Sequence, residues 1–197
     1  MGIENKGIIR AAILVIIFFI FTGTSLTTSL RLRGEPINKT SKFKNIDEEE
    51  VELLSQRGTK YQNTNCLYAL LATSINAQKG TGLTPDSLRE KHTDDKETGA
   101  SLFSAVKILR LEDINFRLYK APSKNADILK LLTKYERIIV PTYLEDGFHS
   151  IMLEDYSVLG SSVFIRYFDP NYKYYNVDSL ETINDQSIDY MYWIAFE

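Results

Sequence analysis

The single cysteine of the sequence, Cys66, stands where its chemistry can be used. It follows Asn63-Thr64-Asn65, whose side chains favour helix starts, and the apolar stretch after it indicates a buried helix. The dipole and free N–H groups of a helix N-terminus favour the thiolate, which is the nucleophilic form of cysteine. Cys66 is therefore a candidate nucleophile. The alternative is a small buried core residue, a common role of free cysteine.

The sequence has two histidines that can serve as a base, and their surroundings differ. His149 follows the turn Glu145-Asp146-Gly147 at the start of an apolar strand. There it can lie at the mouth of a cleft, take the thiol proton and return it to a leaving group. His92 lies in a polar stretch and is interpreted as a solvated surface residue. The alternative for His149 is a surface or structural histidine.

Two further side chains can complete such a site. Asp169 ends the strand that follows the one with His149, so two adjacent antiparallel strands can bring its carboxylate to the imidazole and orient it. Asn171 is a substitute for that role, and simple turn chemistry at Asp169 is the alternative. Gln62 lies four residues before Cys66. Its amide can donate to a developing oxyanion beside the Cys66 N–H, unless it is only a loop residue.

The predicted elements that position these residues change from mainly helices to mainly strands along the chain. Caps and apolar periodicity predict helices and strands in the following ranges: helices from Cys66 to Gly80, from Thr84 onward, at Ser101–Leu111 and Ala126–Tyr135, and strands at Asn115–Lys120, Arg137–Pro141, His149–Tyr156, Ser162–Phe168 and Tyr190–Phe196. Helices first and antiparallel strands later indicate an α+β domain, with a helical N-terminal half packed on a C-terminal antiparallel sheet. The order Gln, Cys, His, Asp on these elements is what a papain-like site requires.

The first part of the chain differs from this domain. An uncharged run from Ala11 to Leu30 has basic residues on both sides and, as a helix, measures about 30 Å, enough to cross a membrane. Residues 1–33 are predicted to be a single-pass membrane anchor, with the domain on the extracytoplasmic side. The alternative is a cleaved signal segment that leaves a secreted or periplasmic protein. Residues 34–56 are predicted to be a polar linker, and 57–197 one domain.

Composition excludes several functions. Hydrophobic residues make up 44% of the chain, which is enough for a packed core without metals or disulfides. The net charge of -3 gives no basic surplus for nucleic acid, so no nucleic-acid partner is expected. One cysteine and two scattered histidines lack the spacing of a zinc site. No metal and no cofactor are expected.

From about Lys60 to Phe196 the chain resembles the double-glycine leader peptidases, the papain-like domains that process bacteriocin precursors, and their stand-alone relatives. The resemblance is carried by QNTNCLYALL at 62–71, LTPDSLR at 83–89, TGAS at 98–101, IIVP at 138–141, HSIMLEDY at 149–156 and VFIRYFDP at 163–170. It implies a papain-like fold, with Cys66 as nucleophile, His149 as base and Asp169 as the orienting residue. Two features depart from the family: Leu67 stands where glycine usually follows the nucleophile, and the oxyanion glutamine usually lies further upstream than Gln62.

The residues and the resemblance together predict a membrane-associated cysteine peptidase that cleaves a peptide or protein substrate. The same three side chains can instead serve an acyltransferase, a transglutaminase-like enzyme or a deamidase, since all of these proceed through an acyl-enzyme and differ in the acceptor. A third alternative is a degenerate module that only binds a peptide in its cleft. The presence of all three residue types argues against that alternative.

Overall fold

The computed structural model describes residues 52–93, 99–144, 147–172 and 174–197 of the 197-residue chain. The predicted anchor or signal segment, 1–33, lies outside the described residues, and the predicted linker 34–56 enters them only from Glu52 onward. Among the helices of the described ranges, none combines the length and the apolar character needed to cross a membrane.

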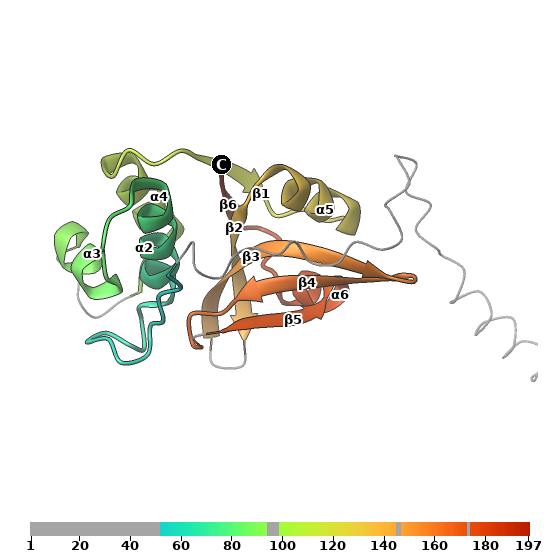
Figure 1. Cartoon of the computed structure of the whole chain (residues 1–197), viewed down its shortest axis with the longest axis horizontal. Coiled ribbons are helices and arrows are strands. Elements are labelled where there is room, and N and C mark those ends of the chain that lie inside the picture. Colours follow the sequence, from blue (N-terminus) through green and yellow to red (C-terminus); the bar gives the residue numbers. More distant parts are fainter. Residues whose placement is uncertain (1–51, 94–98, 145–146, 173) are drawn as a thin grey trace, which may run out of the picture. The chain divides into compact units, whose positions relative to one another are not determined.

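Three helices form the first half of the described chain: α2 (Cys66–Lys79), α3 (Pro85–His92) and α4 (Leu102–Leu111), shown in green in Figure 1. As predicted, α2 begins at Cys66. It ends at Gly80, whose φ of 63° lies in the left-handed region that favours glycine. Every residue from Leu67 to Ile75 is buried, so α2 is the central helix of this half. That burial fixes Cys66 at the exposed end of a rigid element.

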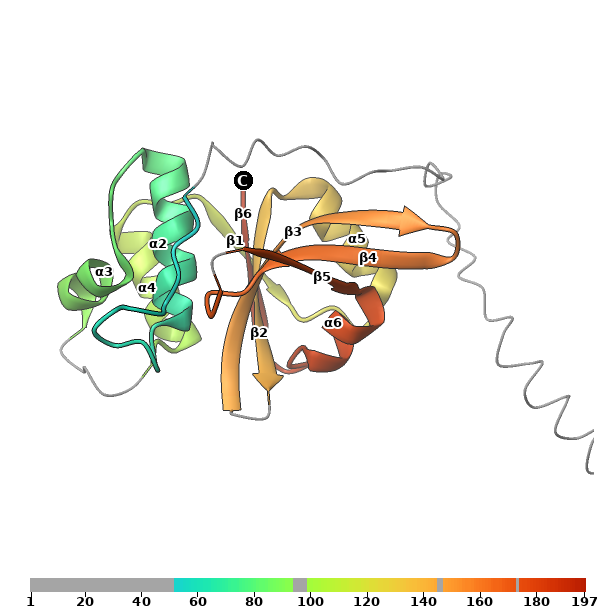
Figure 2. The same ribbon diagram turned by 60° about the horizontal axis from the view of Figure 1, so that its bottom comes forward.

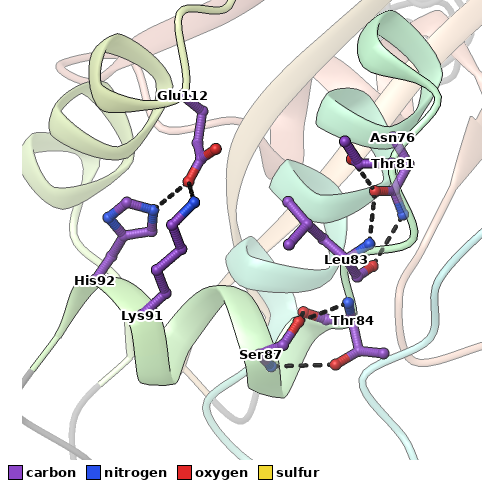
Figure 3. Close-up of polar contacts among 8 residues, drawn as sticks. All are labelled: Asn76, Thr81, Leu83, Thr84, Ser87, Lys91, His92 and Glu112. Atoms are coloured by element: carbon purple, nitrogen blue, oxygen red, sulfur yellow. Dashed lines mark hydrogen bonds and ion pairs between the residues drawn. The ribbon is translucent and has the colours of Figure 1, made fainter.

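The ends of α3 are held by polar contacts (Figure 3). Thr84 and Ser87 cap each other at its start, as each backbone N–H meets the other's hydroxyl oxygen at 3.1 and 2.9 Å. At its end, Lys91 and His92 both pair with Glu112, which follows α4, and the Lys91 contact is 2.7 Å long. Hydrogen bonding from Lys91, and then from His92, lowers the pKa of Glu112. The prediction that His92 is solvated is wrong, because this pairing leaves its side chain only 8% exposed.

The second half of the chain is built around a six-stranded sheet. Its strands are β1 (Phe116–Lys120), β2 (Arg137–Leu144), β3 (Gly147–Leu159), β4 (Ser162–Phe168), β5 (Tyr175–Ser179) and β6 (Tyr192–Phe196). They lie in the order β1-β6-β2-β3-β4-β5, and every neighbouring pair is antiparallel. Two more helices, α5 (Asn125–Lys134) and α6 (Leu180–Gln186), connect the strands.

Helices cover both faces of this sheet (Figures 1 and 2). Successive side chains of a strand point to opposite faces, and the central strands are apolar on both. On one face Ile139, Met152 and Phe168 belong to the hydrophobic cluster formed with α2 and α4. On the other face Ile138 and Leu153 belong to the cluster formed with α5 and α6. The architecture is α+β, with the helical N-terminal half packed on the antiparallel sheet, as predicted.

Two short elements are absent from the sequence prediction. β5 is an edge strand in which no residue is buried, so it lacks the apolar alternation that marks a strand. α6 follows it immediately, begins with Ser179 as its cap and buries only Leu180 and Ile183. At this length the helical period repeats less than twice, which gives pattern analysis little to detect.

Candidate active site

Cys66 occupies the first position of α2, and its thiol is free and partly exposed. Asn65 stands at the cap position, but its side chain makes no capping hydrogen bond. It instead donates to Asp86 at 2.8 Å and to Thr59 at 3.1 Å, and accepts from Arg89 at 3.0 Å. The Cys66 backbone N–H has no partner within the helix at this position. A thiol and a backbone donor therefore stand together at a rigid helix end.

His149 and Asp169 meet at one end of the β3–β4 pair. His149 is the third residue of β3, and Asp169 directly follows β4. Nε2 of His149 lies 2.8 Å from Oδ1 of Asp169. The same carboxylate oxygen accepts a hydrogen bond from the Asn171 backbone N–H at 2.8 Å, while the Asn171 amide nitrogen lies 3.5 Å from His149 Nε2. Asp169 is thus the direct partner of the imidazole, and Asn171 helps to hold Asp169 in place.

The surroundings of His149 change its pKa in two opposing ways. Burial lowers the pKa, whereas the hydrogen bonds to Asp169 and to Cys66 raise it, and the net result is a value of about 9 instead of 6.5. His149 is therefore mainly a cation at neutral pH. Because Nε2 is engaged by Asp169, Nδ1 is the ring nitrogen left for the thiol of Cys66. A cationic imidazole beside a thiol at a helix N-terminus is the setting in which a cysteine acts as a nucleophile.

A cavity of about 400 Å³ lies between the helices and the sheet, and both Cys66 and His149 line it. The other lining residues are Asn63, Thr64, Leu67, Gly99, Ala100, Ser101, Leu102, Ile139, Pro141, Phe148, Ser150, Met191, Tyr192 and Ile194. They come from the segment before α2 and its start, the segment before α4 and its first residue, strands β2, β3 and β6, and the residue before β6. None of these lining residues is an aspartate, glutamate, lysine or arginine. In the described parts of the chain, no three side chains of His, Cys, Asp or Glu gather to hold a metal ion.

Of the four predicted site residues, the structure brings Cys66, His149 and Asp169 together. Gln62 is exposed and does not line the cavity. A different glutamine lies beside the site: Gln56 is buried and donates from Nε2 to Oδ1 of Asn171 at 2.6 Å. No sequence signal marks Gln56, because it ends a polar stretch that has the composition of a linker. Its position becomes visible only when the folded chain brings it to residues 115 positions away.

Comparison with known proteins defines the fold. No protein-family model matches the sequence, and no curated protein matches it. The structure is similar to the peptidase domain of Streptococcus ComA, a bifunctional ABC transporter involved in a quorum-sensing pathway. That similarity has a TM-score of 0.56 at 18% identity and covers 75% of this chain and 99% of the ComA domain.

A second similar structure is that of UfSP from C. elegans, with a TM-score of 0.50 at 10% identity. The similarity covers 74% of this chain but 32% of UfSP, so the chain corresponds to about a third of that protein. Identities this low show the fold alone. The described chain has the papain-like cysteine peptidase fold, as the sequence resemblance implies.

Proposed function

We propose that the chain is a cysteine peptidase in which Cys66 is the nucleophile, His149 the base and Asp169 the residue that orients His149. The observation that carries the proposal is that Cys66 and His149 line one cavity while Asp169 holds the imidazole from its other side at 2.8 Å. The partly exposed thiol argues against the alternative of a core cysteine. The papain-like fold supports the same assignment at the level of architecture.

The reaction begins from the thiolate–imidazolium pair. The Cys66 sulfur attacks the carbonyl carbon of a peptide bond, and the π electrons of the carbonyl move to its oxygen. The His149 cation then gives its proton to the leaving nitrogen, the C–N bond breaks, and a thioester and a free amine result. A water molecule attacks the thioester and passes a proton to His149. Cleavage of the C–S bond releases the carboxylic acid and restores the pair.

The oxyanion of this intermediate needs hydrogen-bond donors. The backbone N–H of Cys66 is one donor that the helix start supplies. Gln62 remains the proposed second donor on the basis of the sequence order, although its side chain is exposed. If it donates, Gln62→Ala should lower kcat about a hundredfold. An unchanged kcat would leave the Cys66 N–H as the donor and remove Gln62 from the site.

The substrate of the proposed peptidase is a peptide or protein. Apart from Cys66 and His149 of the candidate site, the cavity walls carry no Asp, Glu, Lys or Arg, and such mainly apolar walls suit a polypeptide better than a charged metabolite. Membrane association through residues 1–33, with the domain on the extracytoplasmic side, is part of the proposal. A cleaved signal segment is the alternative, and it leads to a secreted or periplasmic enzyme.

The experiment that tests the function uses a peptide library incubated with the full-length protein or with Cys66→Ala, and mass spectrometry of the products. New peptide termini that form only with the native protein support a peptidase. Products joined to added amines would assign an acyltransferase or transglutaminase-like reaction, and glutamine converted to glutamate would assign a deamidase. A thiol-directed affinity probe completes the test. Slow labelling of Cys66 that does not depend on His149, with no product formed, would identify a peptide-binding module.

A further inference from the structure

Residues 55–59 cross the turn that carries Asp169. The backbone N–H of Gln56 donates to the carbonyl oxygen of Pro170 at 2.8 Å, and the hydroxyl of Ser55 donates to the same oxygen at 2.9 Å. Upstream of this contact, Leu53 and Leu54 pack against the hydrophobic cluster of α2. The chain is therefore anchored at Gln56 and just before it, and Gln56 is 8% exposed.

The side chain of Gln56 reaches the base of the candidate site through one intermediate residue. Its Nε2 donates to Asn171 Oδ1 at 2.6 Å. The Asn171 backbone N–H donates to Asp169 Oδ1, which is the oxygen that contacts His149. Asn171 therefore connects Gln56 to the carboxylate that contacts the imidazole.

The main chain of Gln56 reaches the nucleophile side of the same site. Its carbonyl oxygen accepts hydrogen bonds from Thr59, from the hydroxyl at 2.6 Å and from the N–H at 3.3 Å. The Thr59 hydroxyl in turn accepts from the Asn65 amide at 3.1 Å, and Asn65 directly precedes Cys66. Gln56 thus stands between the two halves of the site, since its amide contacts the His149 side and its carbonyl the Cys66 side.

This position is costly for a glutamine. Its Oε1 is buried and has no hydrogen-bond partner among the described residues. A buried amide with an unused acceptor destabilises a fold, and an apolar side chain of similar size would avoid that cost. An apolar side chain would, however, lose the donor that meets Asn171. Packing alone therefore does not account for glutamine at this position.

We propose that Gln56 is a positioning residue that, through Asn171, holds Asp169 and His149 in position relative to Cys66. The proposal rests on the function proposed above and adds a residue that the linker-like sequence of this region does not suggest. Gln56 does not line the cavity, so it acts on the geometry of the catalytic groups and not on the substrate. Its loss should therefore lower kcat and leave KM nearly unchanged.

The test compares Gln56→Leu with a matched control, Gln78→Leu, in the full-length protein. Gln78 also holds distant segments together, because its amide binds the backbone of Asn115 at 3.1 and 3.2 Å, but it lies away from the cavity. Gln56→Leu should lower kcat on the order of tenfold to a hundredfold, as a small displacement of catalytic groups does. The pKa of His149, measured by NMR titration, should move from about 9 toward 6.5 in Gln56→Leu and should stay unchanged in Gln78→Leu.

A double-variant cycle decides whether the effect passes through Asn171. Asn171→Ala removes the other end of the hydrogen bond and also the amide nitrogen that lies 3.5 Å from His149 Nε2, so it should shift the His149 pKa at least as far, and adding Gln56→Leu should change little more. If Gln56→Leu does not fold, Gln56→Met, which keeps the length of the side chain and lacks the Nε2 donor, tests the contact in its place. The proposal would be overturned if the His149 pKa were native in both Gln56→Leu and Asn171→Ala, or if Gln78→Leu shifted it equally. The titration needs no substrate, so absence of turnover in the native protein would count against the proposed function and not against the positioning role.

Discussion

His149 Nε2 lies 2.8 Å from Asp169 Oδ1 although 20 positions separate the two residues in the sequence. The antiparallel pairing of β3 with β4, in which Met152 lies opposite Phe168, brings the two to the same end of the sheet. The contact engages one ring nitrogen and leaves Nδ1 for Cys66. A base held in this way has consequences for activity, for titration and for folding stability.

Asp169→Asn should lower turnover on the order of tens- to thousands-fold, because Asp169 orients and stabilises the imidazolium but does not itself form bonds to the substrate. The pKa of His149 should fall from about 9 toward 6.5, since the carboxylate hydrogen bond and charge are lost. Kinetics and an NMR titration measure the two effects. Asp178→Asn is the control, because Asp178 bonds the Tyr167 hydroxyl at 2.8 Å outside the cavity. A His149 titration that is unchanged in Asp169→Asn would transfer the orienting role to Asn171.

Cys66→Ala should abolish turnover and leave the protein folded. The thiol is partly exposed at the first position of α2, so its removal should change the free energy of unfolding by no more than about 1 kcal/mol. Cys66→Ser should be nearly as inactive, because a hydroxyl is a poor nucleophile in a site built for a thiolate. His149→Ala should lose activity to a similar degree, since members of one catalytic unit do not act additively. Thermal unfolding and product formation are the measurements, and residual activity in Cys66→Ala would exclude Cys66 as the nucleophile.

The raised pKa of His149 makes folding stability depend on pH. The folded protein binds the His149 proton more tightly than the unfolded chain does, with pKa values of about 9 and 6.5. The resulting stabilisation is fully present below about pH 6.5 and is lost as the pH rises through about 9. Urea unfolding measured across this range should show native stability falling more steeply than that of His149→Gln. If the free energies of unfolding of the two proteins changed equally with pH, His149 would not be held as a cation.

Residues before the domain should separate into a dispensable part and a required part. The full-length protein should stay with membranes after an alkaline carbonate wash, and a chain that begins near Asn45 should be soluble and folded.

A chain that begins at Thr59 lacks Leu53 and Leu54, which pack against the core, and should lose about 2 kcal/mol of folding stability or more. Recovery of only a shortened, soluble protein from the exported fraction would favour a cleaved signal segment instead of an anchor.

Local sequence chemistry predicts the elements that carry the three proposed catalytic residues. The apolar run after Cys66 and the glycine at position 80 are strong signals of a helix and its end, and the structure has α2 there. The apolar runs that start at His149 and stop at Phe168 are strong signals of two strands, and the structure has β3 and β4 there. The proximity of Cys66 to His149 is a long-range property. It follows from the order of residue types and from the family resemblance, since no short segment contains both residues.

The parts that the sequence did not predict depend on tertiary contacts. Gln56 and His92 lie in polar stretches whose composition indicates solvent exposure, yet Asn171 and Glu112 provide partners that allow their burial. β5 is recognisable only by its pairing with β4, because a strand with no buried residue has no apolar alternation. For Gln56 and His92 a residue distant in the sequence supplies the missing interaction, and a short window along the chain does not contain that residue.

The position of β6 has a consequence for when the site can first exist during synthesis. This strand follows the other five in the sequence, yet it lies between β1 and β2, and Tyr192 at its start and Met191 just before it line the cavity. A ribosome-bound chain can therefore pair His149 with Asp169 while one wall of the cavity is still missing. Closing such distant strand pairs is the slow part of folding. Labelling of Cys66 by an affinity probe should accordingly appear only in the last phase of refolding, so a nascent chain should not react with the probe until β6 has been made.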